Sequence, residues 1–384
     1  MNYRTIALTA ACLVICGSAL ADLDGDGTSD MAFANGFSQV DQLCFGAAGG
    51  GFTCVDLEPD PTHAIDVAFA DLDGDGDDDV VVAHFSGSSR VCLNGGAGAL
   101  TCADVDSGTN SNEVVIADFD GVNGPDLVFG NSNDNPSRLC RNDGGAASFT
   151  CEDIPGQSQG DVIGTATGDL DGVDGPDVVF VGADIARFCL NDGTGAFTCA
   201  DFYSDSSFFA QDVAVADVDG VNGNDIVAAL HTVPSQLCRN DGAGGFVCED
   251  VGAGVVTTAT AVAVADLNTD SILDIVFTRS ASNFLCTNQG AAGFACGEIS
   301  PDTVNTNDVA AARVDGDAVL DLVFANVNAP NSVCLNDGSG AFSCADVSAD
   351  ADITFGVAIS PGPITVIFRD GFESGGTDAW TTGP

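Results

Sequence analysis

Two segments of the sequence place carboxylates at positions 1, 3, 5 and 9 of a nine-residue loop, residues 22–30 and 71–79. Glycines at positions 4 and 6 let the backbone curl, so that alternate oxygens converge on one point. Carboxylates this close repel one another unless a cation binds, and an all-oxygen ligand set suits calcium rather than zinc or copper. The predicted calcium ligands of these loops are Asp22, Asp24, Asp26, Asp30, Asp71, Asp73, Asp75 and Asp79.

Four more segments have related patterns. Three of them, residues 118–126, 169–177 and 217–225, keep positions 1, 3 and 9 but have Val at position 5, followed by Asn123, Asp174 or Asn222. A sixth loop, residues 266–274, fills every oxygen position, so we expect the strongest binding in loops one, two and six and weaker binding in the Val variants. The predicted ligands are Asp118, Asp120, Asp126, Asp169, Asp171, Asp177, Asp217, Asp219, Asp225, Asp266, Asn268, Asp270 and Asp274.

A seventh loop has Arg313 at position 1, ahead of Asp315, Asp317 and Asp321. Our hypothesis is that the guanidinium replaces the metal as the counter-charge. None of the loops is an EF-hand, because position 12 holds Phe33 or Val82 in the first two instead of Glu. Turn aspartates also cap strands without binding metal, and that alternative stays open for every loop.

The loops recur every 47 to 51 residues, and each belongs to a unit of four short apolar strands. The first strand precedes the loop, the second follows it, and a tight turn such as Asn191-Asp192-Gly193 joins the third and fourth. This pattern predicts an all-β fold, a seven-bladed β-propeller of four-stranded antiparallel blades. Residues 353–360 would supply the missing inner strand of blade one and close the ring. The expected domains are a signal peptide (1–21), the propeller (22–360) and a C-terminal tail (361–384).

The cysteines indicate export. Residues 1–21 have a basic n-region, an apolar run and a small-residue cleavage site, as in a secretory signal peptide. Two of the sixteen cysteines, Cys12 and Cys16, lie in this segment. The other fourteen flank the last hairpin of each unit, which predicts local disulfides in an oxidising compartment, either extracellular (secreted or at the cell surface) or periplasmic. The predicted pairs are Cys44/Cys54, Cys92/Cys102, Cys140/Cys151, Cys189/Cys199, Cys238/Cys248, Cys286/Cys296 and Cys334/Cys344.

The charge balance limits the possible partners. The chain has 57 acidic and 9 basic residues, a formal net charge of −48, yet 45% of it is hydrophobic. It can therefore bury a core, while nucleic acid and anionic membrane surfaces are excluded as expected partners. No membrane insertion is expected either, because the apolar run near the N-terminus is too short to span a bilayer.

The aspartate-rich loop between two strands, followed by the Leu-Asn-Asp-Gly-x-Gly-x-Phe hairpin at residues 190–197, resembles the FG-GAP/VCBS repeat family. The resemblance covers nearly the whole mature chain. It implies a propeller like the head of integrin alpha chains, loop carboxylates that bind calcium, and export of a bacterial type. The paired cysteines are an addition to the usual hairpin of that family.

The loops on the opposite face of the propeller vary most and suit ligand binding. No catalytic motif is recognisable, so no enzyme activity is predicted. The expected function is a secreted, calcium-binding, monomeric module for recognition or adhesion, with an extracellular glycan or protein as ligand. The alternatives are a structural protein of the envelope or extracellular matrix and a propeller hydrolase or lyase. The polar and aromatic residues of that face are His63, His84, His231, Phe202, Tyr203, Phe208 and Phe209.

Overall fold

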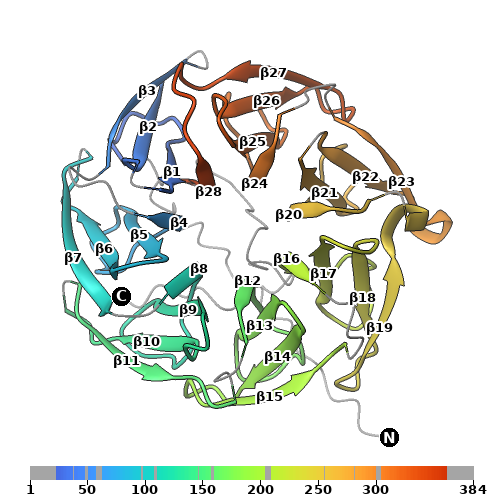
Figure 1. Cartoon of the computed structure of the whole chain (residues 1–384), viewed down its shortest axis with the longest axis horizontal. Coiled ribbons are helices and arrows are strands. Elements are labelled where there is room, and N and C mark those ends of the chain that lie inside the picture. Colours follow the sequence, from blue (N-terminus) through green and yellow to red (C-terminus); the bar gives the residue numbers. More distant parts are fainter. Residues whose placement is uncertain are drawn as a thin grey trace, which may run out of the picture.

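The computed structural model describes residues 23–360, apart from 38, 48–50, 58–62, 97, 108–109, 146, 157–159, 204–208, 255, 281 and 300–303. Seven four-stranded antiparallel sheets surround a central axis and form a ring (Figure 1). The predicted seven-bladed all-β propeller is confirmed. The signal peptide, the tail, Asp22 and Phe208 lie outside the described residues.

The blades are given from the innermost strand outward. Blade one contains β28 (Thr354–Ile359), β1 (Met31–Asn35), β2 (Gln42–Ala47) and β3 (Gly51–Asp56). Blade two contains β4 (Ala64–Ala70), β5 (Asp79–His84), β6 (Ser88–Asn94) and β7 (Leu100–Ser107). Blade three contains β8 (Asn110–Ala117), β9 (Asp126–Ser132), β10 (Arg138–Asn142) and β11 (Phe149–Asp153). Blade four contains β12 (Val162–Gly168), β13 (Asp177–Gly182), β14 (Ile185–Asn191) and β15 (Phe197–Asp201).

Blade five contains β16 (Ala210–Ala216), β17 (Asp225–Leu230), β18 (Gln236–Asn240) and β19 (Phe246–Asp250). Blade six contains β20 (Ala259–Ala265), β21 (Asp274–Arg279), β22 (Phe284–Asn288) and β23 (Phe294–Glu298). Blade seven contains β24 (Thr306–Ala312), β25 (Asp321–Asn326), β26 (Ser332–Asn336) and β27 (Phe342–Asp346). Helical structure among the described residues is limited to the short 3₁₀ turns η1 (Val251–Gly254) and η2 (Gly290–Ala292), and none of it is long and apolar enough to cross a membrane.

The ring closes as the sequence predicts. Strand β28 pairs antiparallel with β1, with Met31 opposite Ile359 and Phe33 opposite Val357. Blade one is therefore built from both ends of the propeller sequence, and the red β28 lies beside the blue β1 in Figure 1. This pairing leaves no open edge between the first and last blades.

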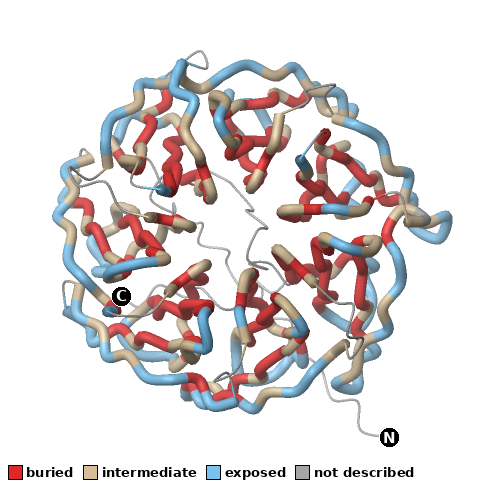
Figure 2. Tube along the Cα trace, viewed as in Figure 1, coloured by how far each residue is buried: buried red, intermediate tan, exposed pale blue. Residues whose placement is uncertain are grey.

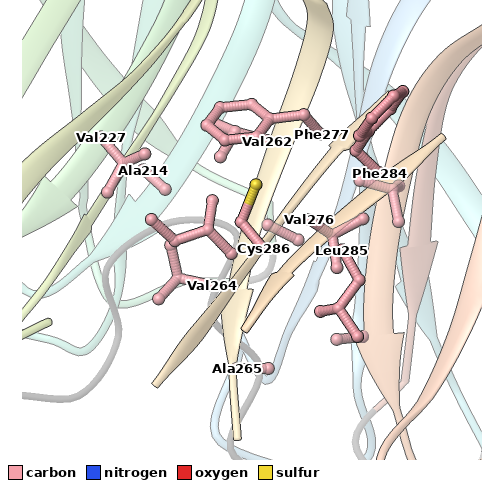
Figure 3. Close-up of a cluster of buried hydrophobic side chains, with 14 of the residues drawn as sticks. Ala214, Val227, Val262, Val264, Ala265, Val276, Phe277, Phe284, Leu285 and Cys286 are labelled. Atoms are coloured by element: carbon pink, nitrogen blue, oxygen red, sulfur yellow. The ribbon is translucent and has the colours of Figure 1, made fainter. Parts of the chain in front are cut away.

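The core lies between the faces of neighbouring sheets. The second strands are nearly all buried, and the fourth strands alternate between exposed and partly buried residues (Figure 2). Small and large side chains interlock across the blade boundaries. In Figure 3, Ala214 and Val227 of blade five pack near Val262 and Val264 of blade six. Each fully buried valine or leucine contributes roughly 1.5–3 kcal/mol through removal of apolar surface from water.

All seven predicted cysteine pairs are disulfide-bonded. Each pair joins directly opposite residues of the third and fourth strands, such as Cys189 and Cys199, whose Cα atoms are 3.9 Å apart. The bonds fasten the outermost strand of every blade to its neighbour. Seven such bonds indicate an oxidising, extracellular environment.

Candidate metal sites

The aspartate-rich loops connect the first and second strands of each blade. Because strand direction alternates, the turn between the third and fourth strands lies at the same end of the blade. The two meet directly: Asn94 N, at the end of β6, donates to Asp79 Oδ1 at 2.8 Å. Loop and turn thus form one acidic end on every blade.

Among the residues that the structure describes, four loops bring three carboxylates together, always from positions 1, 3 and 9. In each set one oxygen per residue lies within 4.8 Å of the corresponding oxygens of the other two. This arrangement can hold a divalent cation among oxygen ligands. The sets are Asp71, Asp73 and Asp79 in blade two; Asp118, Asp120 and Asp126 in blade three; Asp169, Asp171 and Asp177 in blade four; and Asp217, Asp219 and Asp225 in blade five.

The aspartate at position 9 is buried, and in blades two to seven both of its oxygens accept backbone hydrogen bonds. Asp177 Oδ2 accepts from Leu170 N and Oδ1 from Asn191 N, both at 2.8 Å. Asp321 makes the same two bonds at 2.9 and 2.8 Å, although its loop has Arg313 at position 1. Position 9 therefore ties the loop to the third strand in every kind of loop, in addition to any role as a ligand.

Burial raises the pKa of these position-9 carboxyls, because it disfavours the charged form. Desolvation, opposed by the two backbone hydrogen bonds and reinforced by the neighbouring aspartates, raises the pKa to about 7 for Asp79, Asp126 and Asp177. The same causes raise the pKa of Asp225 and Asp274 to about 6. A bound divalent cation would supply the positive charge that favours ionisation of these groups.

In blade two a fourth acid, Asp78, lies next to the cluster. Desolvation and the charge of Asp71 raise the pKa of Asp78 to about 7, and its buried Oδ2 has no hydrogen-bond partner. The loop of blade two therefore brings a fourth carboxyl close to the set of Asp71, Asp73 and Asp79.

The residue at position 5 lies outside the three-carboxylate sets. Asp75 Oδ1 accepts from Asp77 N at 3.0 Å, and the equivalent Val122 is 52% exposed. Asn123 and Asn222, the neighbours of the valines, donate to Asn142 O and Asn240 O of their hairpins. Loss of the position-5 carboxylate therefore leaves the other three acids together.

The other three loops have an undescribed position or a different residue: Asp22 of loop one lies outside the described residues, Asn268 takes position 3 in loop six, and Arg313 takes position 1 in loop seven. In loop one, Asp26 Oδ1 accepts from Thr28 N and Oγ1, and Asp30 Oδ1 accepts from Gly46 N at 2.8 Å. In loop six, Asp266 Oδ2 accepts from Ser271 N at 2.8 Å, and Asn268 Oδ1 accepts from Asp270 N at 3.0 Å. In loop seven, Arg313 Nε donates to Ala318 O at 3.2 Å. Calcium binding in these loops, and the role of Asp24 and Asp270 as ligands, stays a prediction.

The asparagine at the end of the third strand has a second role that the sequence pattern does not predict. The pattern predicts only a hairpin turn there, but in the structure the side chain also donates a hydrogen bond to the preceding blade. Asn191 Nδ2 donates to Phe119 O, in the loop of blade three, at 2.8 Å. Five equivalent bonds span 2.7 to 3.1 Å, from Asn94, Asn142, Asn240, Asn288 and Asn336 to the loop of the preceding blade.

His63 precedes β4 and His84 ends β5, so both lie at the same end of blade two. Strand register places Ala64 opposite His84 and Phe85 next to His63, so the two rings project from opposite faces of the sheet. His84 Nδ1 lies 2.8 Å from Ser88 O, whereas His63 packs on Phe37 with ring centroids 4.9 Å apart.

The remaining aromatic residues of that face are partly structural. Phe202 and Tyr203 pack against the core of blades four and five, and Phe209 forms an edge contact with His231 at 5.9 Å. A small pocket opens on this face between blades six and seven. It is lined by Asn283, Val304, Thr306, Phe324, Asn326, Ser332 and Cys334.

The fold and the acidic clusters define the class: a seven-bladed β-propeller with repeated candidate cation sites, consistent with a recognition module.

No protein-family model matches the chain, and no curated protein matches it. Solved structures do resemble it. One is an Agrocybe aegerita lectin that specifically recognises non-reducing terminal N-acetylglucosamine (TM-score 0.63, 18% identity, 87% of this chain and 95% of the lectin covered). Another is a candidate 6-phosphogluconolactonase from Bacteroides uniformis (TM-score 0.59, 12% identity, 87% and 99% covered). At these identities the likeness concerns the fold alone.

Proposed function

We propose that this chain is an exported calcium-binding propeller of the FG-GAP/VCBS type that recognises a glycan or protein ligand. The observation that carries the proposal is the recurrence of one carboxylate set, positions 1, 3 and 9, at the same place in four blades. A chance cluster of surface acids has no reason to recur in register. All-oxygen ligation favours calcium among common divalent ions, since magnesium keeps more of its water.

Export is part of this proposal. The seven disulfides support an extracellular location, and the proposed processing removes residues 1–21 as a signal peptide. The propeller would then comprise residues 22–360, with residues 361–384 as a separate tail.

The ligand would bind on the face opposite the acidic loops. The water-sized pocket between blades six and seven contributes little to such binding, because Asn283, Thr306 and Asn326 hydrogen-bond one another there. That face also has Phe37, which is 62% exposed and stacks on His63. An exposed aromatic ring that can pack on C–H groups suits a neutral sugar. The lectin with the same fold supports a glycan as the first class to test.

The test is a thermal melt of the mature, disulfide-bonded protein with EDTA and with Ca²⁺. Ion binding at about 100 times Kd stabilises the folded state by about 2.7 kcal/mol per site, so the melting temperature should rise with Ca²⁺. The double variant Asp169→Asn/Asp171→Asn should lose part of this rise, whereas Asp192→Asn, an exposed aspartate in the hairpin turn of the same blade, should keep all of it. Equal melting temperatures in EDTA and Ca²⁺ would contradict the metal proposal.

The ligand is tested separately by applying the Ca²⁺-loaded protein to a neutral-glycan array. We expect retention by one family of terminal sugars, reduced by Phe37→Ala. Lack of retention by every sugar would contradict the glycan assignment and leave the calcium result unaffected.

A further inference from the structure

The residue between the cysteine and the asparagine of the third strand differs among the four blades that have a three-carboxylate set. It is Leu93 in blade two and Leu190 in blade four, but Arg141 in blade three and Arg239 in blade five. This position lies beside the acidic loop, because the next residue donates its N–H to the position-9 carboxylate. An arginine here therefore places a guanidinium next to the candidate cation site.

Arg141 contacts the loop of its own blade and the turn of the next one. Its Nε lies 3.4 Å from Oδ2 of Asp120, the position-3 carboxylate, and its Nη1 pairs with Glu152. Its Nη2 donates to Gly195 O at 3.0 Å. Three separate partners fix the orientation of the guanidinium, so its charge remains at the acidic loop.

Arg239 repeats this arrangement in blade five. Its Nε lies 3.0 Å from Asp219 Oδ2, again the position-3 carboxylate, and its Nη1 pairs with Glu249. The same oxygen of the same loop position is thus engaged by an arginine in both blades.

We infer that Arg141 and Arg239 act as internal cations that weaken divalent-cation binding in blades three and five, so that the tighter sites are those of blades two and four. The inference rests on the proposed calcium binding. A divalent ion bound to Asp120 or Asp219 would lie beside a fixed positive charge and would compete with it for one oxygen. In blades two and four, leucine leaves that oxygen free of such a partner.

Blades three and four provide a comparison within the molecule. Their loops share Gly at position 4, Val at position 5 and Pro at position 8, and both hold the three-carboxylate set. Beside the two sets, blade three has Arg141 where blade four has Leu190, and it has Asn123 at position 6 where blade four has Asp174. Both differences favour a bound cation in blade four, so the single substitutions at Arg141 and Leu190 are needed to separate the effect of the arginine from that of Asp174.

The experiment measures Ca²⁺ binding to the mature, disulfide-bonded protein by isothermal titration calorimetry in wild type, Arg141→Leu and Arg239→Leu. Each substitution should tighten one site by about tenfold, because it removes the adjacent positive charge. The matched control is Arg187→Leu. Arg187 carries the same charge on the third strand of blade four but pairs with Asp201 and Gly156 O, away from the acidic loop. That control should leave Ca²⁺ affinity unchanged.

The reverse exchange, Leu190→Arg, should weaken the site of blade four by a similar factor, which tests the inference even where loss of Arg141 disturbs folding. If Arg141→Leu and Arg187→Leu bind Ca²⁺ alike while the wild type binds it, the inference is wrong and the proposed function stands. If the wild type binds no Ca²⁺, the calcium proposal fails and the inference fails with it.

Discussion

The side chain of Asn191 makes hydrogen bonds both within its own hairpin turn and to the neighbouring blade. Its Nδ2 donates to Phe119 O of the preceding blade, and its Oδ1 accepts from Gly193 N and Gly195 N at 3.1 Å. All of these groups lie at an end of the blade where the strand ladders stop. A buried carbonyl left without its donor costs about 1–3 kcal/mol.

We therefore expect Asn191→Ala to destabilise the protein by about 2 kcal/mol, because Phe119 O and two turn amides lose a partner. Chemical denaturation with fixed disulfides measures the change. Thr198→Ala, at an exposed position of the adjoining strand β15, is the control and should have a much smaller effect. A variant at position 191 as stable as this control would show that the bonds between blades contribute little.

Thr269 occupies a backbone conformation that glycine favours. Its φ is 61°, whereas the equivalent residues Gly74 and Gly172 have φ of 79° and 75°. A β-branched residue in the left-handed region is strained by about 1–2 kcal/mol.

Thr269→Gly should therefore stabilise the protein by roughly 1 kcal/mol, less than the strain because glycine is more flexible when unfolded. Thr198→Gly, at an exposed position in β15, should do the opposite, since glycine weakens a strand. Differential scanning calorimetry of both variants distinguishes relief of strain from a general effect of glycine.

At the scale of the elements, the acidic loops couple stability to pH. The folded pKa of the position-9 carboxyls is raised above 3.8, mainly by desolvation, so the folded protein holds protons that the unfolded chain releases. Each protonated carboxyl contributes fully to the stability of the folded protein when the pH is below the pKa of the same group in the unfolded chain. This contribution is lost as the pH rises through the pKa of the folded protein, about 6 to 7.

In EDTA, the melting temperature should consequently decrease between pH 5 and pH 8, as buried carboxyls ionise without a counter-charge. Ca²⁺ should reverse the trend, because the ion binds the ionised form, and binding at pH 6 should release protons. Calorimetric titrations in buffers with different ionisation enthalpies measure that release. Proton uptake in place of release would contradict this account.

The sequence predicted the local elements well and the contacts between blades poorly. Short apolar runs broken by Asp and Gly gave the four strands, and the cysteine spacing gave the pairing of the last two. The bonds of Asn191 and the pairing of Arg141 with Asp120 could not be inferred, because their partners depend on how strands stack in space. The same holds for Asp66, an acid on an inner strand whose Oδ2 accepts from Val114 N of the next blade at 3.0 Å.

The boundary between blades seven and one differs from the other six. Blade one has Gly46 in place of the asparagine, and a Cβ there would lie 2.4 Å from Ser29 O. Ser29 Oγ instead donates to Arg313 O at 2.9 Å, across the boundary. At this boundary a serine hydroxyl therefore donates the hydrogen bond between blades, whereas an asparagine side-chain amide donates it at the other six boundaries.

At the scale of the whole molecule, closure depends on β28. Four of its six residues are buried, and it provides the innermost strand of a sheet that otherwise begins with β1. Asp308 Oδ2 of blade seven accepts from Val357 N at 2.8 Å, which ties this strand to both of its neighbours.

A chain that ends at residue 352 should therefore melt at a markedly lower temperature than one that ends at residue 360, and should associate through the uncovered edge of β1. Calorimetry and light scattering of the two truncated proteins measure these effects. Identical melting and a monomeric state for both would show that the ring does not need this strand.

The late position of β28 also bears on the order in which the protein is made. Six blades are each encoded in one continuous stretch of about fifty residues and can complete their hydrogen bonding as synthesis proceeds. Blade one is synthesised first, but its innermost strand β28 is translated more than three hundred residues after β1, so its sheet stays incomplete until then. A molecular chaperone or an interim contact that shields the waiting edge would act at this blade alone.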